Sequence, residues 1–213
     1  MKNIRIIPCD SKSIPTLAQL HSTIIPGSHI VQLGFDFLTR VFYPTLLQGE
    51  HGGALIAYYG DDAVGFVAFS YNTEKFIAAV AQKRFKIAKA IVKEFICNPS
   101  ILSIIIKSMS YSRNVTNEPF TDVSAEYLSM GVIEEYRRTE FIRKNKIYLA
   151  KDLFTACFKP FQEKGIDSFR ILTKADNSQA NIFYQMLGAK KHFNGFIRGE
   201  KGNIYIYTIK SRI

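Results

Sequence analysis

The stretch of sequence that decides the fold is Thr173–Ala189, which reads TKADNSQANIFYQMLGA. We predict a helix over Ser178–Leu187, because Asp176 or Asn177 can cap its start. The residues just before it, Ser168–Thr173, are predicted to form a strand. Taken alone, a strand followed by a capped helix also fits an ordinary α/β protein.

Strands and helices alternate along the rest of the chain, which predicts an α/β (α+β) fold class. The other expected strands are Ile4–Pro8, Ala54–Tyr59, Ala63–Phe69, Val123–Val132, Phe193–Ile197 and Asn203–Ile209. The other expected helices are Ile14–His21, Leu33–Leu47, Thr73–Tyr111 with a break at Asn98–Pro99, and Lys146–Lys164 ended by Gly165. The turn residues 60–62 predict a hairpin between the second and third strands.

Composition predicts a folded domain with a real core. The chain has 213 residues, 47% of them hydrophobic and 22% charged. This length suits one domain with an insertion, since domains average roughly 150 residues. Because 28 Lys and Arg stand against 18 Asp and Glu, the formal net charge is +10. An anionic partner is therefore expected, and a phosphate compound, nucleic acid and a membrane surface all remain open.

Cysteine spacing and hydropathy argue against several protein classes. Cys9, Cys97 and Cys157 lie far apart, without the paired spacing of a zinc site or redox motif, so we interpret them as reduced and structural. No apolar run reaches the eighteen or so residues of a membrane-spanning helix, and Ile4–Ile7 is too short for a signal-peptide core. We expect a cytoplasmic protein.

Two segments resemble the GCN5-related N-acetyltransferase (GNAT) superfamily. Thr173–Ala189 is similar to its second signature, in which Phe-Tyr precedes Leu-Gly-Phe, with Ala189 in place of the last aromatic residue. Ala125–Val132 resembles its fourth strand. The resemblance implies one domain over 1–213 with a mixed, mostly antiparallel twisted sheet flanked by helices. A helical insertion, at about 74–112, is expected between the third and fourth strands.

The resemblance also implies two catalytic residues. Glu126 matches the position of the general base, and Tyr184 matches the residue that protonates the departing coenzyme A thiolate. Strand alternation predicts that Glu126 shares one face with Leu128, Met130 and Val132, where desolvation would raise the pKa of its carboxyl group. Glu126 as a structural residue paired with Lys or Arg, and Tyr184 as an ordinary buried tyrosine, are the alternatives.

Coenzyme-binding residues follow from the same resemblance. The backbone groups of Met130 and Val132 match those that pair with the pantetheine arm as an added strand would. Asn177 matches a residue that contacts the same arm, although an asparagine there is also a plain helix cap. The resemblance implies acetyl-CoA as cosubstrate and no metal.

The expected pyrophosphate loop departs from the family pattern. Arg137 and Arg138 are predicted to lie at the pyrophosphate, but Glu140 and Ile142 stand where glycines would let backbone amides approach the phosphates. Either 139–145 is an insertion that widens the loop, or the helix begins early with a different phosphate contact. Arginine side chains can replace some amide contacts. A solvated basic helix start is the other interpretation.

Three further features are His21 followed by Ile25-Pro26, the stretch Leu33–Leu38, and the helical insertion between the third and fourth strands. Together they resemble a GNAT branch found in bacterial polysaccharide and amino-sugar pathways. This resemblance implies that His21, Ser28, His29 and Phe35 line the acceptor site. A lone histidine on a helix is more often structural. The basic stretch Lys83–Lys93 is expected to meet an anionic acceptor, to rest on a membrane surface as a peripheral contact, or to be a solvated face.

Two functional hypotheses follow. The first is an N-acetyltransferase that moves an acetyl group from acetyl-CoA to a primary amine by direct attack, the acceptor classes including an amino sugar or a nucleotide-linked amino sugar. The second is a catalytically silent GNAT-like protein that binds coenzyme A, a protein partner or nucleic acid. The absent loop glycines favour the second, and Glu126 with Tyr184 favours the first. A nucleic-acid module ranks last because it lacks a reading motif, and the oligomeric state is not set by the sequence.

Overall fold

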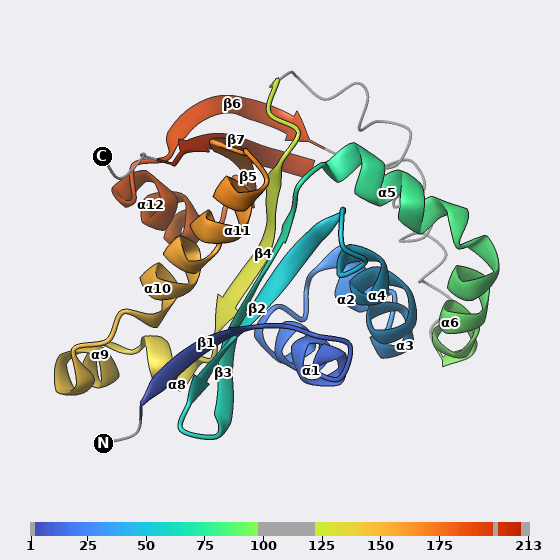
Figure 1. The fold of residues 1–213 in the computed structure, drawn as a ribbon, viewed down its shortest axis with the longest axis horizontal. Helices are drawn as coiled ribbons and strands as arrows, with labels where there is room; N and C mark the ends of the chain where they lie inside the picture. The colour runs from blue at the N-terminus through green and yellow to red at the C-terminus, as the bar shows by residue number, and fades with distance from the viewer. Residues whose placement is uncertain (1–2, 98–121, 198–199, 210–213) are drawn as a thin grey trace.

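A computed structural model describes residues 3–97, 122–197 and 200–209. Within these ranges seven strands form one twisted sheet in the order β1-β2-β3-β4-β5-β7-β6 (Figure 1). The strands are β1 (Ile4–Pro8), β2 (Gly52–Tyr59), β3 (Asp62–Ser70), β4 (Glu126–Val132), β5 (Ser168–Lys174), β6 (Lys190–Ile197) and β7 (Glu200–Thr208). Every neighbouring pair is antiparallel except β4 and β5, which run parallel. The predicted mixed, mostly antiparallel sheet is confirmed.

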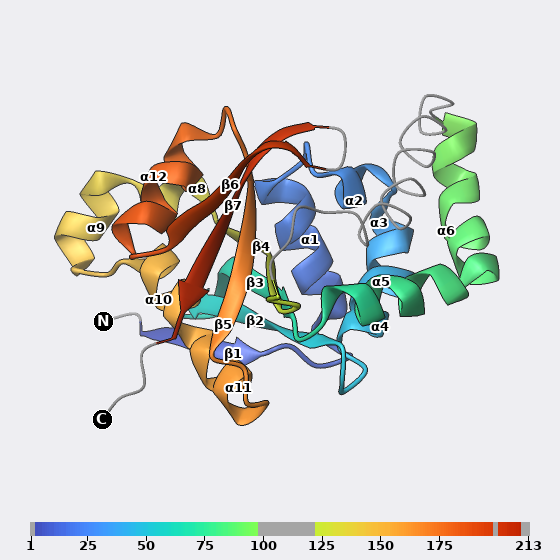
Figure 2. The same cartoon turned by 90° about the horizontal axis from the view of Figure 1, so that it is seen from above.

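Helices cover both faces of the sheet (Figures 1 and 2). One face carries α1 (Ile14–Ile24), α2 (His29–Gln32), α3 (Phe35–Phe37), the π-helical turn Leu38–Phe42, α4 (Tyr43–Leu46), α5 (Thr73–Gln82) and α6 (Arg84–Cys97). The other carries α10 (Leu149–Ala156), α11 (Phe158–Glu163) and α12 (Ser178–Met186). The short helices α8 (Glu134–Arg137) and α9 (Thr139–Asn145) follow β4 and lie beside the end of the sheet that carries the start of β1.

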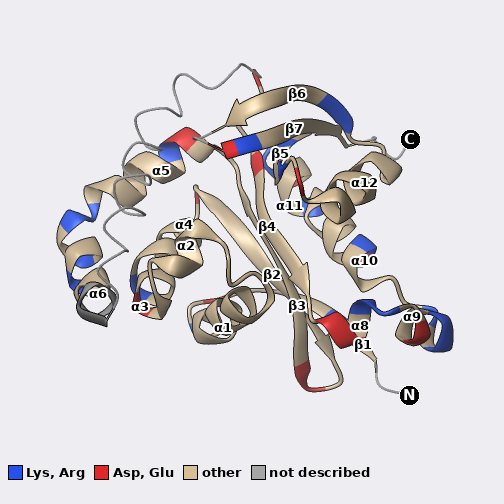
Figure 3. Ribbon diagram, turned by 180° about the vertical axis from the view of Figure 1, so that it is seen from behind, with Lys and Arg blue, Asp and Glu red and all other residues tan. Residues whose placement is uncertain are grey.

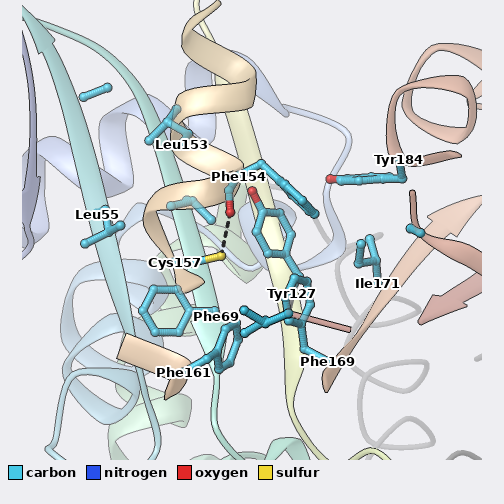
Figure 4. Packing of buried hydrophobic residues seen from close by; sticks show 14 of the residues in the cluster. Leu55, Phe69, Tyr127, Leu153, Phe154, Cys157, Phe161, Phe169, Ile171 and Tyr184 are labelled. Atoms are coloured by element: carbon cyan, nitrogen blue, oxygen red, sulfur yellow. Dashed lines mark hydrogen bonds between the residues drawn. The ribbon is translucent and has the colours of Figure 1, made fainter. Parts of the chain in front are cut away.

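Each face of the sheet has its own hydrophobic core. Between the sheet and helices α10–α12, the rings of Phe161 and Phe169 stack with centroids 4.9 Å apart, and Tyr127 lies next to them (Figure 4). On the α1 side, Leu17 and Phe66 are fully buried. Burying each such side chain contributes about 1.5–3 kcal/mol relative to leaving it in water. The two cores fix which face of β4 looks toward which set of helices.

Most predicted elements are confirmed, and three helix predictions were wrong in detail. The helix predicted from Thr73, with a first break at Asn98–Pro99, is already divided at Lys83 into α5 and α6. The predicted helix Lys146–Lys164 is two helices, because Pro160 has no N–H to donate to the carbonyl of Ala156. The predicted helix Leu33–Leu47 begins at Phe35 instead, after Gly34 with φ of 99°. It contains a π-helical turn, a feature that local sequence patterns do not reveal.

The second strand begins with two glycines, and two helices follow the third strand. Gly52 and Gly53 form the start of β2, ahead of the predicted start at Ala54. A side chain at Gly52 would collide with the backbone of Phe69, so glycine allows the strands to pair there. Helices α5 and α6 stand between β3 and β4, where the helical insertion was expected. Residues 98–121, including the predicted break at Asn98–Pro99, lie outside the described residues.

Gly131 generates the first prediction, because it lets α1 approach β4. A Cβ at this position would overlap Cγ2 of Ile24 on α1. Gly131→Ala is therefore expected to destabilise the protein by about 1–3 kcal/mol, through overpacking. Ile24→Ala should relieve the overlap, so we expect the double variant to be more stable than the sum of the two single changes. Urea unfolding of all four proteins is the measurement, and strictly additive free energies would contradict this account.

Candidate active site

Strands β4 and β5 form a gap that opens toward their C-terminal ends. They pair at two positions only, Glu126 with Arg170 and Tyr127 with Ile171. Beyond Tyr127 the two strands separate, so the backbone groups of the rest of β4 have no partner on β5 in the described structure. The two strands therefore splay apart along this part of the sheet. An unpaired strand edge can accept an extended ligand as an additional strand.

A bulge in β4 changes which residues share a face. Ala68 of β3 lies opposite Ser129, whereas the next residue, Phe69, lies opposite Tyr127, so Leu128 is the extra residue. After the bulge, Met130 and Val132 face the α10–α12 core together with Tyr127. Glu126 does not share a face with them. The predicted common face was wrong, because strict alternation fails wherever a strand contains an extra residue.

Glu126 is buried and forms an ion pair at the end of the gap where β4 and β5 still pair. It is 2% exposed, and its Oε2 accepts hydrogen bonds or ionic contacts from Nε and Nη2 of Arg170 at 3.0 and 2.9 Å. The sequence prediction placed Glu126 in apolar surroundings, with a pairing to Lys or Arg as the alternative. The structure pairs it with Arg170, a residue that sequence reasoning did not identify, because the pairing is visible only once β4 and β5 are adjacent.

Tyr184 lies on the α10–α12 side of the gap. Its ring packs edge-on against Tyr127, with centroids 6.0 Å apart, and its hydroxyl oxygen points toward Tyr127 and Phe154 (Figure 4). Burial, reinforced by the nearby Cys157, raises the pKa of the Tyr184 phenol well above its usual range. Its hydroxyl therefore keeps its proton at neutral pH, as a proton donor must.

Asn181 joins the end of β5 to α12. Its Oδ1 accepts hydrogen bonds from Thr173 at 2.6 Å and from Asn203 at 2.8 Å. A third bond comes from the hydroxyl of Tyr205 at 3.0 Å. Its Nδ2 donates to the carbonyl of Asn177 at 2.8 Å. Sequence reasoning missed this residue, although an asparagine inside a helix, where it is a poor helix former, is a usable signal.

Asn177 is the N-cap of α12. Its Oδ1 accepts a hydrogen bond of 3.1 Å from the backbone N–H of Ala180. The cap predicted from the sequence is confirmed, and the side chain is exposed at the start of the helix. The predicted contact with a pantetheine arm stays a prediction.

Arg137 reaches across the gap between the two segments that follow β4 and β5. Its Nη1 contacts Oε1 of Gln179 on α12 at 3.4 Å. Arg138 instead forms an exposed ion pair with Glu134, one turn earlier, at 2.8 Å. Further Lys and Arg residues colour α9 blue beside α8 (Figure 3). The two predicted phosphate ligands therefore have different surroundings, with only Arg137 touching both sides.

The loop after β4 contains an inserted helix. Glu140 and Ile142 lie within α9, whose bounds match the insertion 139–145 that was one of the two sequence alternatives. Tyr59, Tyr136 and Phe141 hold this helix against the end of β2 through ring contacts of 5.1–5.7 Å.

The segment directly before α10 is Lys146–Tyr148. Lys146 has φ of 55°, the left-handed conformation that favours glycine. A glycine-like backbone turn therefore precedes the sheet-packed helix α10 even though no glycine is present. The predicted position of the pyrophosphate at Arg137 and Arg138 stays a prediction.

His21 is completely buried under β4. Its Nδ1 lies 2.7 Å from the hydroxyl oxygen of Tyr43, and its Nε2 lies 3.3 Å from Oγ of Ser129. Burial lowers the pKa of His21 to about 4. The side chain was predicted to line the acceptor site, but it lies beneath the surface, and Ser129 is the residue that it supports.

The other predicted acceptor residues lie around two features of the same face. Exposed His29 pairs with Glu200 of β7 at 3.2 Å, and Glu200 also pairs with Lys174 at the end of β5 at 3.0 Å. Ser28 precedes α2 and is half-buried.

Phe35 lines an open pocket of about 460 Å³ between α1, α3 and the end of β4. The other lining residues are Pro15, Thr16, Gln19, Leu20, Thr23, Ala63 and Ile133. This pocket does not include Glu126, Ser129 or Tyr184.

The described thiols are poor nucleophiles. Burial, together with the charge of Asp10, raises the pKa of Cys9 to about 12. Burial also raises the pKa of Cys157 well above its usual value, and its Sγ contacts the carbonyl oxygen of Phe154 (Figure 4). Because the thiolate is the reactive form, both are structural cysteines, as the sequence predicted. The side chain of Cys97 lies outside the described residues.

The described residues contain neither a metal-binding group nor a membrane-spanning helix. No group of three or more His, Cys, Asp or Glu side chains is arranged to hold a metal ion in the ranges given above. In the same ranges, none of the helices has both the length and the apolar character needed to cross a membrane.

The fold matches solved acetyltransferases. No protein-family model and no curated protein matches the sequence. Arabidopsis thaliana NAA60 in complex with acetyl-CoA is similar at TM-score 0.56 and 15% identity, over 97% of this chain and 99% of that one. The aminoglycoside N-acetyltransferase AAC(6')-Iy in complex with CoA reaches TM-score 0.59 at 13% identity, over 92% and 94%. A GNAT family acetyltransferase from Elizabethkingia anophelis with acetyl-CoA bound reaches 0.51 at 12% identity, over 98% and 100%. At these identities the likeness shows the fold, which is that of GNAT acetyltransferases.

The second prediction concerns stability and pH. His21 has a pKa near 4 in the folded protein against 6.5 for a free histidine, so the unfolded chain binds this proton more tightly. Above about pH 6.5 the titration of His21 does not change the free energy of unfolding. As the pH falls toward 4, it lowers that free energy progressively, by up to about 3 kcal/mol.

Urea unfolding between pH 7 and pH 4.5 is the measurement, with His21→Gln as the comparison. The variant lacks the titrating ring, so its stability should fall less steeply with acid than that of the parent. Equal slopes for both proteins would show that His21 is not the group responsible.

Proposed function

We propose that this protein is an acyltransferase that moves an acetyl group from acetyl-CoA to a primary amine. The observation that carries the proposal is the gap between β4 and β5, which leaves a strand edge unpaired and has Tyr184 on one side. Two of the solved structures that share the fold contain acetyl-CoA and a third contains CoA. In this proposal the pantetheine arm lies along the free edge of β4, where the backbone groups of Met130 and Val132 pair with it. Asn177, at the start of α12, contacts the same arm.

Arg137 and Arg138 hold the pyrophosphate in this proposal. Arg137 is the stronger candidate, because its contact with Gln179 already brings its guanidinium to the mouth of the gap. The left-handed turn at Lys146 adds a second feature that suits phosphate, since the free N–H groups at the start of α10 follow it directly. Side-chain cations at 143, 144 and 146 supply the charge that glycine-rich loops provide through backbone amides.

The chemistry is direct attack by the amine on the thioester carbon. The C–N bond forms, the C–S bond breaks, one amine proton passes to a base and the thiolate takes a proton from an acid. Glu126 is the proposed base and Tyr184 the proposed acid. The raised pKa of Tyr184 keeps its proton available until the thiolate forms. The unreactive thiols of Cys9 and Cys157 support transfer without a cysteine acyl-enzyme.

The acceptor in this proposal is an amino sugar or a nucleotide-linked amino sugar. The pocket at Phe35 combines an aromatic ring with the hydroxyl and amide groups of Thr16 and Gln19, which suits a polyhydroxylated ring. His29 and Glu200 stand on the same face and offer an imidazole ring and a carboxylate. One solved structure with this fold is an aminoglycoside N-acetyltransferase, which supports an acceptor of this class.

A catalytically silent GNAT-like protein that binds coenzyme A is the second candidate. The ion pair between Glu126 and Arg170 favours it, because a carboxylate held by a guanidinium is less available to take an amine proton. The two candidates differ in one experiment. Acetyl-CoA should raise the melting temperature in both, while thiol release with a panel of primary amines should occur only with the enzyme.

The third prediction tests the phosphate ligands. Arg137→Glu is expected to weaken coenzyme A binding by well over tenfold, since a charge-assisted contact contributes roughly 1.5–3 kcal/mol and the new charge repels phosphate. Arg138→Glu should weaken it by at least tenfold as well, although it also loses its ion pair with Glu134. Isothermal titration calorimetry is the measurement, and Lys159→Glu on α11 is the matched change of charge. Unchanged affinity in both arginine variants would place the phosphates elsewhere.

The fourth prediction tests the acid and the base. Glu126→Gln is expected to lower turnover by about 10² to 10⁴ while coenzyme affinity stays nearly unchanged, because glutamine keeps the size but not the basicity. Tyr184→Phe should slow turnover less, since water can protonate the thiolate. Turnover against pH with an accepted amine is the measurement. A Glu126→Gln protein with full turnover and the parent pH profile would show that Glu126 only holds Arg170.

A further inference from the structure

A chain of three polar side chains runs through the core beneath β4. Tyr43, at the start of α4, and His21, on α1, are both 0% exposed. The Tyr43 hydroxyl lies 2.7 Å from Nδ1 of His21, and Nε2 of the same ring lies 3.3 Å from Oγ of Ser129. The His21 ring also packs on Phe66, with centroids 5.0 Å apart. Burying such groups is costly unless each is hydrogen-bonded, and an apolar side chain would fill the same space without that cost.

The donors and acceptors available to each group decide the direction of the hydrogen bonds from Tyr43 to Ser129. Within the described residues, the Tyr43 hydroxyl bonds only to His21, so its proton must go to Nδ1 if it is not to be left unsatisfied. Burial raises the pKa of Tyr43, so that the proton is present. The ring is then the neutral tautomer with its hydrogen on Nε2, and this hydrogen points at Ser129. Ser129 accepts the bond, which leaves its own O–H free to donate.

Ser129 stands where the gap between the strands begins. It follows the bulge residue Leu128 and lies two positions beyond Tyr127, the last residue of β4 that pairs with β5. Its side chain is on the α1 face and is half-buried, so its hydroxyl group is not sealed inside the core. In the described structure its hydroxyl makes no hydrogen bond besides the one to His21. A directed donor therefore sits beside the free strand edge.

We propose that Ser129 is a catalytic residue whose hydroxyl donates a hydrogen bond to the carbonyl oxygen of the acyl group, with His21 and Tyr43 as positioning residues behind it. The inference rests on the proposed acetyl transfer and adds the group that stabilises the developing oxyanion. Donors already aimed at the place where charge develops lower the barrier without reorganising. Each bond in a chain polarises the next, so Tyr43 and His21 make the Ser129 proton a better donor.

The step balances without any further reactant. The amine nitrogen attacks the carbonyl carbon, the carbonyl π electrons move to oxygen, and Ser129 donates a hydrogen bond to this oxygen without giving up its proton. Collapse of the intermediate restores the C=O bond, expels the thiolate and forms the amide. The amine proton leaves to the base and the thiolate takes a proton from the acid, so Ser129, His21 and Tyr43 end as they began.

A mutant cycle on turnover tests the chain. Ser129→Ala is expected to lower kcat by about 10- to 100-fold, with affinity for acetyl-CoA within about twofold of the parent, because the bond strengthens only as charge develops. Tyr43→Phe should lower kcat by about threefold or more in the parent, through the weaker donor. In the Ser129→Ala background, Tyr43→Phe should change kcat by less than about twofold, since nothing remains for it to polarise.

Thr45→Val is the matched control. Its hydroxyl is also buried but donates to the carbonyl of Val41, four residues earlier, and takes no part in the hydrogen bonds from Tyr43 to Ser129. We expect this variant to keep the parent kcat. Melting temperatures of all variants separate a loss of fold from a loss of function. Retention of the parent kcat by Ser129→Ala, or multiplicative effects of the Ser129 and Tyr43 changes, would overturn the inference.

A measurement that needs no acceptor tests the directed donor by itself. Nitrogen and carbon chemical shifts of isotope-labelled histidine in the full chain report the tautomer, and His21→Gln assigns the signal among the four histidines. A neutral ring with its hydrogen on Nε2 is expected at pH 7. The opposite tautomer would overturn the inference even in an active enzyme. A parent protein that binds acetyl-CoA but acetylates no amine would instead overturn the proposed function, and the catalytic role of Ser129 with it.

Discussion

The contact between β4 and β5 is the constraint on which the rest of the structure depends. The two strands are the only parallel neighbours in the described sheet, and they pair over two residues. At that short contact Glu126 and Arg170 form a buried ion pair, while Tyr127 packs between Phe154 and Phe169 on the opposite face. A buried pair of charges tolerates little movement, because separating its partners leaves charge without compensation. The strands are therefore held together at one end and are free to part at the other.

The bulge at Leu128 decides which residues of β4 face each set of helices. One face carries Met130 and Val132 toward α10 and α12, which is the side where Tyr184 lies. The other face carries Ser129 and Gly131 toward α1, and the absence of a side chain at Gly131 brings α1 close enough for His21 to reach Ser129. With this extra residue, Met130 and Val132 lie on the same side of the strand as Tyr127, while Ser129 and Gly131 lie on the α1 side. In a regular strand Ser129 and Gly131 would instead share the face of Tyr127, away from α1.

Polar groups outside the gap keep its two walls in position. Asn181 ties the end of β5 to α12 through three accepted hydrogen bonds, and the pairs of Glu200 with His29 and Lys174 link β7 to both α2 and β5. On the far side, the inserted helix α9 is held by aromatic contacts to Tyr59. The insertion brings cationic side chains and a left-handed turn to the start of α10.

Much of the fold could be predicted from the sequence, because it is encoded locally. The cap at Asn177, the hairpin between β2 and β3, and the extent of the first strand all depend on residues within a few positions of one another. The short motif around Tyr184 was similarly local, and it pointed to the GNAT fold that the solved structures share.

What only the tertiary structure decided involves residues that are distant in the sequence or a change in strand register. The partner of Glu126 lies on another strand, so no pattern around Glu126 could name Arg170. The bulge is invisible to alternation, because period two assumes one residue per position on each strand. His21 was predicted to line the acceptor site, with a structural role as the alternative, and the packing of α1 against β4 buried it and joined it to Ser129. The sequence by itself determined the elements and the class of fold, and the packing of those elements decided which polar groups meet, since hydrogen bonds and ion pairs act only over a few ångströms.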